Sequence, residues 1–185
     1  MTLFGRPASI TAFFRAQRGI ESEVEDSFTI ILQYDRSGPQ KDLLVTVKTS
    51  VTTPMDKQLK YWIRGTKGSY IKFQQTSLCP QESQIAAELP PTDPEFGMES
   101  KAFKGTLTTY EEFDGKIQKF DESIKKYTGR YPSIQGKWMG LYENVADAIL
   151  GRAELAVEAV QSRDVLRIIE LARESHNEGK TVQWR

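Results

Sequence analysis

Hydrophobic and polar residues alternate along two stretches in the first third of the chain, residues 24–34 and 43–51. Alternation with a period of two is typical of strands that bury one face. The segment between them (RSGPQ, residues 36–40) is rich in turn residues, so the two stretches are predicted to pair as antiparallel strands. The more apolar face of the first stretch carries Val24, Asp26, Phe28, Ile30, Leu32 and Tyr34.

Shorter strand patterns follow the same logic elsewhere in the chain. Residues 10–17, 59–64 and 69–73 are expected to be strands, and the last two flank a glycine hairpin (GTKG, residues 65–68) placed for positive φ. Residues 105–120 resemble a further hairpin, with Asp114–Gly115 as its two-residue turn. Between about residues 75 and 105 the periodicity fails and prolines and glycines recur, which is typical of a functional or mobile loop.

The last third of the chain has helical periodicity. Two apolar stripes at helical spacing predict two helices, and Gly179 stands where a C-terminal cap belongs. The stripes are formed by Leu141, Val145, Ala148 and Ile149, and by Val165, Ile168, Ile169 and Ala172. Two helices cannot cover both faces of a five- or six-stranded sheet, so the other face is expected to contact a subunit or domain. Its residues would include Thr29, Ile31, Thr46, Lys48 and Ser50.

Composition narrows the class of protein. The 185 residues suffice for one domain, and the 25 basic and 25 acidic residues leave no net charge that would favour nucleic acid or a membrane surface. No apolar run approaches the roughly 18 residues of a membrane span. The single cysteine, Cys79, excludes an internal disulfide and fits a reducing compartment, so we expect a cytoplasmic protein with a free, unreactive thiol.

The titratable residues offer no obvious catalytic group. His176 is the one histidine and is expected to be a solvated residue near the end of the last helix, so a zinc site has no support. Acidic residues cluster around residues 21–26 and 111–114, which are most simply solvated strand ends and turns. The sequence Gly-x-Gly-x-x-Gly of dinucleotide-binding domains does not occur, and the four residues of GTKG lie between predicted strands.

An ordered series of motifs nevertheless resembles one family. GRYPSI at residues 129–134, WMGLYENVADAI at 138–149, QSRDVLRIIELARES at 161–175 and EGKTV at 178–182 are similar to the tail of the Gfo/Idh/MocA oxidoreductases. LFGRP at residues 3–7 resembles the start of that family's second domain. IRGTKGSYIK at residues 63–72 resembles its mid-sheet hairpin.

The resemblance implies both a chemistry and a missing part. Members of the family oxidise or reduce sugars, inositols and similar polyols with NAD or NADP, which an N-terminal Rossmann domain binds. Their catalytic Glu-Lys-Pro and Asp-x-x-x-His motifs have no counterpart here, and the latter would fall immediately before Leu3. A truncated reading frame, an excised domain and a gene that lost its first half all remain open. NAD or NADP is therefore expected only if a Rossmann domain is supplied upstream.

The resemblance also places one wall of a sugar pocket on the sheet and on the segment before the penultimate helix. Aromatic rings stack on sugar rings, and lysine or tyrosine heads bond to hydroxyls, although the tyrosines also fit core packing. At residues 137–138 the family more often has a small polar residue and a tyrosine, so specificity is expected to differ. The candidate substrate-binding residues are Lys57, Tyr61, Tyr131, Lys137, Trp138 and Tyr142.

The sequence thus predicts an α+β fold with a large, mainly antiparallel sheet and helices on one face. A single domain is expected over residues 1–185, with the sheet at about 8–120 and the helices at about 138–178. Its expected role is substrate binding and oligomerisation in a sugar- or polyol-specific oxidoreductase, without redox activity of its own and with no catalytic residue. Two alternatives are a free-standing homo-oligomeric binding or scaffold protein and a cofactor-independent isomerase or cyclase.

Overall fold

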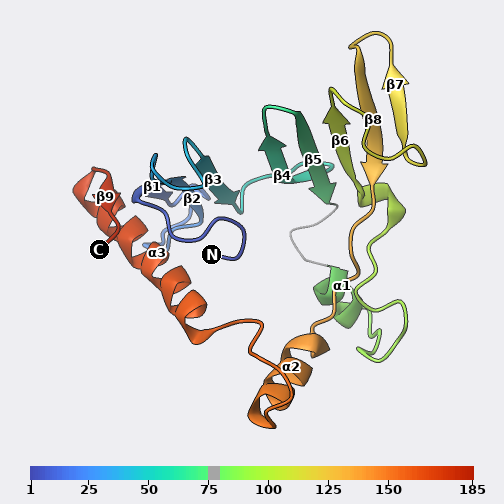
Figure 1. Ribbon diagram of the computed structural model, residues 1–185. Coiled ribbons are helices and arrows are strands. Elements are labelled where there is room, and N and C mark those ends of the chain that lie inside the picture. Colours follow the sequence, from blue (N-terminus) through green and yellow to red (C-terminus); the bar gives the residue numbers. More distant parts are fainter. Residues whose placement is uncertain (75–79) are drawn as a thin grey trace. The chain divides into compact units, whose positions relative to one another are not determined.

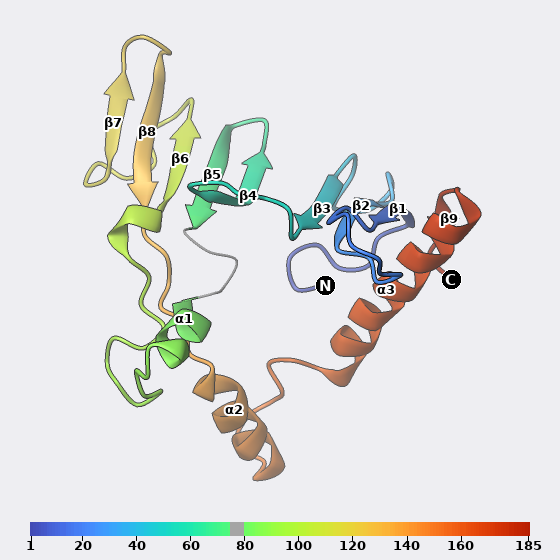
Figure 2. The same cartoon turned by 180° about the vertical axis from the view of Figure 1, so that it is seen from behind.

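The computed structural model describes residues 1–74 and 80–185, so the prediction for Cys79 lies outside the described residues. The chain divides into two compact units: residues 1–54 with 155–185 form unit 1, and residues 55–154 form unit 2. Each unit has its own antiparallel sheet (Figures 1 and 2). The α+β class and the antiparallel pairing are confirmed, but the described strands form two sheets where one was expected. The single domain of residues 1–185 stays a prediction.

The sheet of unit 1 has the strand order β3-β2-β1-β9. Its strands are β1 (Ser9–Arg15), β2 (Ser27–Gln33), β3 (Leu44–Ser50) and β9 (Val182–Gln183). β2 pairs with β3, as the two alternating stretches predicted, and Ile30 lies opposite Val47. The terminal β9 pairs with the start of β1, where Ile10 lies opposite Val182.

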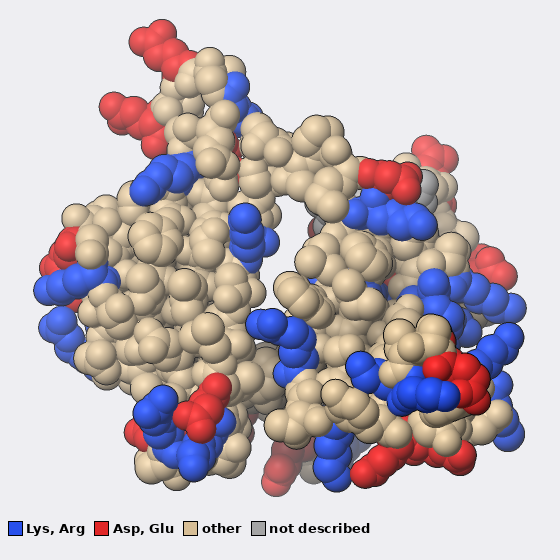
Figure 3. Space-filling model, turned by 90° about the horizontal axis from the view of Figure 1, so that it is seen from above, with Lys and Arg blue, Asp and Glu red and all other residues tan. Residues whose placement is uncertain are grey.

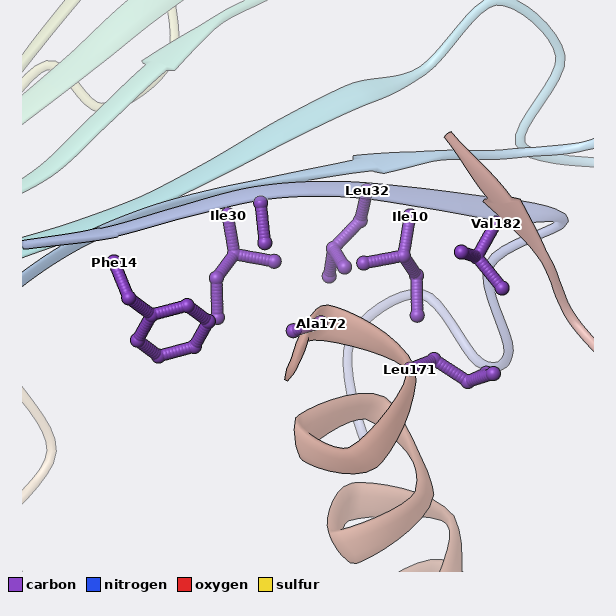
Figure 4. Close-up of a cluster of buried hydrophobic side chains, with 8 residues drawn as sticks. Ile10, Phe14, Ile30, Leu32, Leu171, Ala172 and Val182 are labelled. Atoms are coloured by element: carbon purple, nitrogen blue, oxygen red, sulfur yellow. The ribbon is translucent and has the colours of Figure 1, made fainter. Parts of the chain in front are cut away.

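One helix covers this sheet. Helix α3 (Ala159–Glu178) packs Leu171 and Ala172 against Ile10, Ile30 and Leu32, and Figure 4 shows the strand side chains pointing toward the helix. Alternation along β1 and β2 places these strand residues on one face, which becomes the buried face. Gly179 ends the helix with a left-handed φ of 63°, so its predicted role as the cap is confirmed.

The buried face of α3 differs in part from the predicted stripe. Ala172 is buried and Ile168 packs on the core, but Val165 and Ile169 are 45% and 47% exposed. The buried positions are instead Asp164, Leu171, Ala172 and Ser175. His176 is half-buried, with its ring 5.6 Å from that of Phe14, and is not the solvated residue that was expected.

The sheet of unit 2 has the strand order β4-β5-β6-β8-β7. Its strands are β4 (Gln58–Arg64), β5 (Gly68–Gln74), β6 (Gly105–Thr109), β7 (Gln118–Asp121) and β8 (Lys126–Tyr131). The hairpin β4–β5 is confirmed, yet neither of its glycines has a positive φ. Gly68 is required for close approach, because a Cβ there would lie 2.4 Å from the carbonyl oxygen of Thr108.

The hairpin predicted over residues 105–120 is wrong. β6 pairs with β8, and β8 forms its hairpin with β7 through residues 122–125. The turn at Asp114 exists, since its carbonyl oxygen accepts from the amides of Ile117 and Gln118, but it does not join two paired strands. β8 and β9 also lie beyond the range 8–120 expected for strands.

Among the described residues of unit 2, two short helices and one longer helix complete the secondary structure. α1 (Pro80–Ala86) and the 3₁₀ turn η1 (Lys101–Phe103) lie in the segment that lacked periodicity. α2 (Met139–Ile149) has no buried residue, so its predicted apolar stripe is not a core face of this unit: Leu141 is 50% exposed and Ile149 80%.

Candidate functional site

The six candidate substrate residues all belong to unit 2. Lys57 precedes β4 and is exposed. Tyr61 lies in β4 opposite Lys72 of β5, and Tyr131 ends β8 opposite Gly105 of β6. Residues directly opposite in an antiparallel pair share a face, and Lys72, Tyr70 and Leu107 connect the two pairs by register. Tyr61 and Tyr131 therefore lie on one face of the sheet.

The other three candidates lie at the start of α2. Lys137 and Trp138 line a cavity of about 540 Å³, and Trp138 remains 44% exposed. Tyr142 is 67% exposed and is not among the lining residues. The structure therefore brings together two of the six predicted residues in one cavity.

The cavity lies between two segments that are far apart in sequence. The lining residues are Pro91, Thr92, Asp93, Pro94, Phe96, Gln135, Gly136, Lys137, Trp138, Met139 and Glu143. The first five come from the loop after α1, and the rest come from the connection between β8 and α2 and from α2 itself. An apolar concavity with a few polar groups is the usual form of a small-molecule site.

Hydrogen bonds hold the two segments together. The side-chain amide of Gln135 donates to the carbonyl oxygens of Pro94 (3.0 Å) and Phe96 (2.7 Å). The amide of Gly136 donates to the carbonyl oxygen of Gly97 at 3.0 Å. Gln84 of α1 accepts from the amide of Gly97 at 2.7 Å, which fixes the loop from its other side. The cavity wall is therefore a defined structure although it contains little regular secondary structure.

The charges at the cavity are paired or locally bonded. The Lys137 ammonium donates to a carboxylate oxygen of Glu143 at 2.5 Å, and a carboxylate oxygen of Asp93 accepts from the amide of Glu95 at 2.8 Å. Beside them, the exposed part of Trp138 offers an aromatic surface. These groups suit a ligand with several hydroxyls, because hydroxyls both donate and accept hydrogen bonds while ring C–H groups stack on an indole.

Sequence reasoning missed the most buried charge of unit 2. Lys72 is 7% exposed, and its ammonium donates to the carboxylate of Glu99 at 2.5 Å and to the hydroxyl of Ser133 at 2.7 Å. The Ser133 hydroxyl in turn donates to the same Glu99 oxygen at 2.6 Å. Lys72 is a strand residue with no charged neighbour in sequence, so no local pattern indicated its burial.

The acidic clusters are not solvated throughout as expected, because the side chain of Asp26 is only 3% exposed. Asp26 accepts hydrogen bonds from the amides of Gln17 and Arg18, and these bonds hold the pKa of its carboxyl below the ordinary value of 3.8. The Arg173 guanidinium similarly lowers the pKa of Glu25. Glu112 accepts from the Tyr127 hydroxyl, which raises the pKa of that tyrosine.

No group of three or more metal-ligating side chains occurs within residues 1–74 and 80–185. The GTKG segment joins two antiparallel strands, β4 and β5, and does not lead from a strand into a helix. It therefore does not fit a dinucleotide phosphate. In the part of the chain that the structure describes, no helix is both long and apolar enough to cross a membrane. Basic and acidic side chains are interspersed on the face seen in Figure 3.

The comparison with known proteins decides the family. Residues 1–184 match the family model described as the oxidoreductase family, C-terminal alpha/beta domain (GFO_IDH_MocA_C). The chain belongs to the Gfo/Idh/MocA oxidoreductase family. This confirms the resemblance seen in the sequence motifs.

Relatives of this family domain are about twice as long as the chain. An uncharacterized oxidoreductase of Schizosaccharomyces pombe (C115.03) is 33% identical over 185 residues, which cover 99% of this chain and 48% of that protein. The scyllo-inositol 2-dehydrogenase (NADP+) IolW of Bacillus subtilis is 31% identical over 97% of this chain and 44% of its own. The putative oxidoreductase YvaA of Bacillus subtilis has a solved structure with a TM-score of 0.81 and 30% identity, covering 100% of this chain and 47% of that one.

Proposed function

We propose that this Gfo/Idh/MocA domain forms the substrate wall of an NAD(P)-dependent oxidoreductase that acts on sugars or polyols. The observation that carries the proposal is the cavity beside α2, where Trp138 offers a stacking surface next to the Lys137–Glu143 pair. One of its relatives is named for an inositol, a ring that carries hydroxyls. This chemistry and that relative support a sugar or polyol as the substrate class.

The redox chemistry would come from another polypeptide segment. The GTKG hairpin joins two strands and does not fit a dinucleotide phosphate, and the chain spans about half the length of the relatives it matches. In this proposal NAD or NADP binds to a Rossmann domain, and the present domain orients the polyol for hydride transfer. We also propose that the protein acts in the cytoplasm.

Direct binding tests the cavity. Isothermal titration of the chain with scyllo-inositol, myo-inositol and glucose should detect one of them, and Trp138→Ala should weaken that binding about tenfold. Tyr142→Ala is the matched control, because this tyrosine lies on α2, which begins directly after Trp138, but outside the cavity. An equal loss of polyol affinity in Trp138→Ala and Tyr142→Ala, or no binding of any polyol, would count against the proposal.

A fusion tests the redox role. Residues 1–185 replace the corresponding half of the Bacillus subtilis inositol dehydrogenase, and NADP reduction is followed with each polyol. We expect turnover by the fusion, lower turnover when it carries Trp138→Ala, and no dinucleotide binding by the present chain alone. Tight binding of NADPH to the chain alone would contradict the division of labour proposed here.

We further propose that unit 1 makes a homo-oligomer through the face of its sheet opposite α3. Phe13, which lies opposite Thr29 across β1 and β2, is 48% exposed on that face, and Thr46 and Lys48 are exposed beside it. Light scattering after size-exclusion chromatography should show an oligomer that Phe13→Glu dissociates. Ile124→Glu, an equally exposed residue in a turn of unit 2, should not dissociate it. A chain that is monomeric at high concentration would refute this role and the scaffold alternative together.

A further inference from the structure

The buried ammonium of Lys72 contacts both segments that form the cavity. Its side chain is 8% exposed, and that of Glu99 is 15% exposed. Glu99 lies three residues after the lining residue Phe96, and Ser133 lies two residues before the lining residue Gln135. Both partners are distant from Lys72 along the chain, by 27 and 61 residues. One strand residue therefore anchors two remote segments.

A charge in such a place needs its partners. Removing a lysine ammonium from water costs free energy unless a counter-charge and further hydrogen bonds compensate it. Here the carboxylate of Glu99 and the hydroxyl of Ser133 supply that compensation, and the serine also bonds to the carboxylate. The three groups form a closed triangle, which has one compact arrangement because each member bonds to both others.

Among residues 1–74 and 80–185, the other hydrogen bonds of the wall join the segments mainly to one another and to α1. Gln135 and Gly136 bond to the loop at residues 94–97, and Gln84 bonds to the same loop. These bonds join the two segments to one another and to α1. The guanidinium of Arg130 in β8 donates a hydrogen bond to the carbonyl oxygen of Ala102, which belongs to the same segment as Glu99. The triangle ties both segments to β5.

We propose that Lys72 is a positioning residue that sets the cavity wall against the sheet through Glu99 and Ser133. The proposal rests on the proposed function only in its consequence for ligand affinity. Lys72 itself is not placed in contact with the substrate. Its loss would release both segments from β5 while leaving their mutual bonds intact, so the cavity would persist with an altered position and shape.

The wall can be observed without a ligand. In chain labelled with 5-fluorotryptophan, the ¹⁹F resonance of Trp138 reports the wall and that of Trp184 reports unit 1, each assigned by substitution with phenylalanine. Lys72→Met and Glu99→Gln should each displace or broaden the Trp138 resonance and leave that of Trp184 in place. Lys119→Met, an exposed lysine of the same sheet, is the matched control and should change neither. An unchanged Trp138 resonance in folded Lys72→Met would overturn the proposal.

A double variant separates positioning from stability. Lys72→Met with Glu99→Leu removes both buried charges, and apolar replacement of a buried ion pair is often neutral for stability. We expect the urea midpoint to return toward that of the wild-type chain while the Trp138 resonance stays displaced. If the urea midpoint and the Trp138 resonance both returned to their wild-type values, packing alone would determine the position of the wall, and the proposal would be overturned.

Affinity provides the link to function. If the wild-type chain binds a polyol, Lys72→Met should weaken that binding between about 10- and 100-fold, since small displacements of a positioned wall have effects of this size. Lys119→Met should bind as the wild type does. A displaced Trp138 resonance in a chain that binds no polyol would sustain the positioning role and reject the proposed function. Polyol binding that is unchanged in Lys72→Met would reject the positioning role alone.

Discussion

Gly97 and Gly136 meet backbone to backbone at the cavity wall. The amide of Gly136 donates to the carbonyl oxygen of Gly97 at 3.0 Å, and a Cβ on Gly97 would lie 1.9 Å from the carbonyl oxygen of Gly136. Gly97 also has a φ of 81°, a conformation that side chains rarely adopt. Both the contact and the dihedral angle therefore require glycine at position 97.

Gly97→Ala should destabilise unit 2 and deform the cavity. Overlap with the carbonyl oxygen together with the positive φ is expected to cost about 1–3 kcal/mol in the free energy of unfolding. Urea unfolding followed by tryptophan fluorescence measures it. Gly115→Ala is the control, because a Cβ there meets nothing within 4 Å and its φ is not positive. Equal midpoints for the two variants would contradict the close approach.

Ser175→Ala should destabilise unit 1. Ser175 is 1% exposed. Its hydroxyl accepts a hydrogen bond from the amide of Ala12 at 3.0 Å and donates one to the carbonyl oxygen of Lys180 at 2.6 Å. β9 pairs only with Ser9 and Ile10, so Ser175 continues the hydrogen bonding of β1 where β9 ends. Leaving the Ala12 amide without this acceptor is expected to cost about 1–3 kcal/mol, measured by urea unfolding.

The matched control for Ser175 is Ser162→Ala, an exposed serine on the same helix. Its unfolding midpoint should stay at the wild-type value or rise slightly, since alanine has the higher helix propensity. A loss of stability as large as that of Ser175→Ala would show that the helix, and not the bond to β1, is responsible.

Leu171→Ala should be among the most damaging substitutions in α3. Leu171 is fully buried against Ile10 and Val182, and truncation of such a residue costs about 2–5 kcal/mol. Leu166→Ala, on the same helix but 63% exposed, should change the free energy of unfolding by no more than about 0.5 kcal/mol. Thermal and urea unfolding that rank these variants in the opposite order would contradict the observed packing of α3.

Acid should weaken the attachment of the N-terminal segment to α3. The Arg6 guanidinium bonds to Asp164 at 2.6 Å and, with Arg163, holds the pKa of that carboxyl below 3.8. Because the folded-state pKa is the lower one, the stabilisation is complete above the unfolded pKa and is lost as pH falls through the folded pKa.

Stability measured from about pH 7 to about pH 3 should therefore fall less steeply in Asp164→Asn than in the wild type, from a lower starting value. Asp147→Asn, which removes an exposed carboxylate 3.8 Å from Arg152, should keep the wild-type slope. Parallel curves for Asp164→Asn and the wild type would exclude this carboxyl as an acid-sensitive group.

Local patterns predicted what local physics determines. Alternation placed Ile30 and Leu32 on the buried face of β2, and Gly179 was recognised as a cap from its position after an apolar helix. The motif at residues 137–138 led to two residues that line the cavity, through the family resemblance.

The predictions that were wrong or missing depend on contacts between residues that are far apart in the sequence. Asp114–Gly115 has turn chemistry, but β6 finds its partner in β8, beyond β7, and no turn signal specifies that choice. Ile169 and Leu171 are both apolar, and which of them faces the sheet depends on the rotation of α3 about its axis. Lys72 had no sequence signal, because its two partners come from segments that only the fold brings near.

The order β3-β2-β1-β9 has a consequence for synthesis of the chain. Unit 1 is assembled from residues 1–54 and 155–185, whereas unit 2 is continuous. As the polypeptide leaves the ribosome, β1 and β2 are made before unit 2, whereas Leu171 and Val182, which cover Ile10, are made more than 150 residues after Ile10. Unit 2 can thus complete its folding while the apolar face of β1 and β2 is still exposed, because α3 and β9 have not yet been made. Nascent chains should be most prone to aggregate in that interval, and chaperones that hold exposed apolar strands should act on them there.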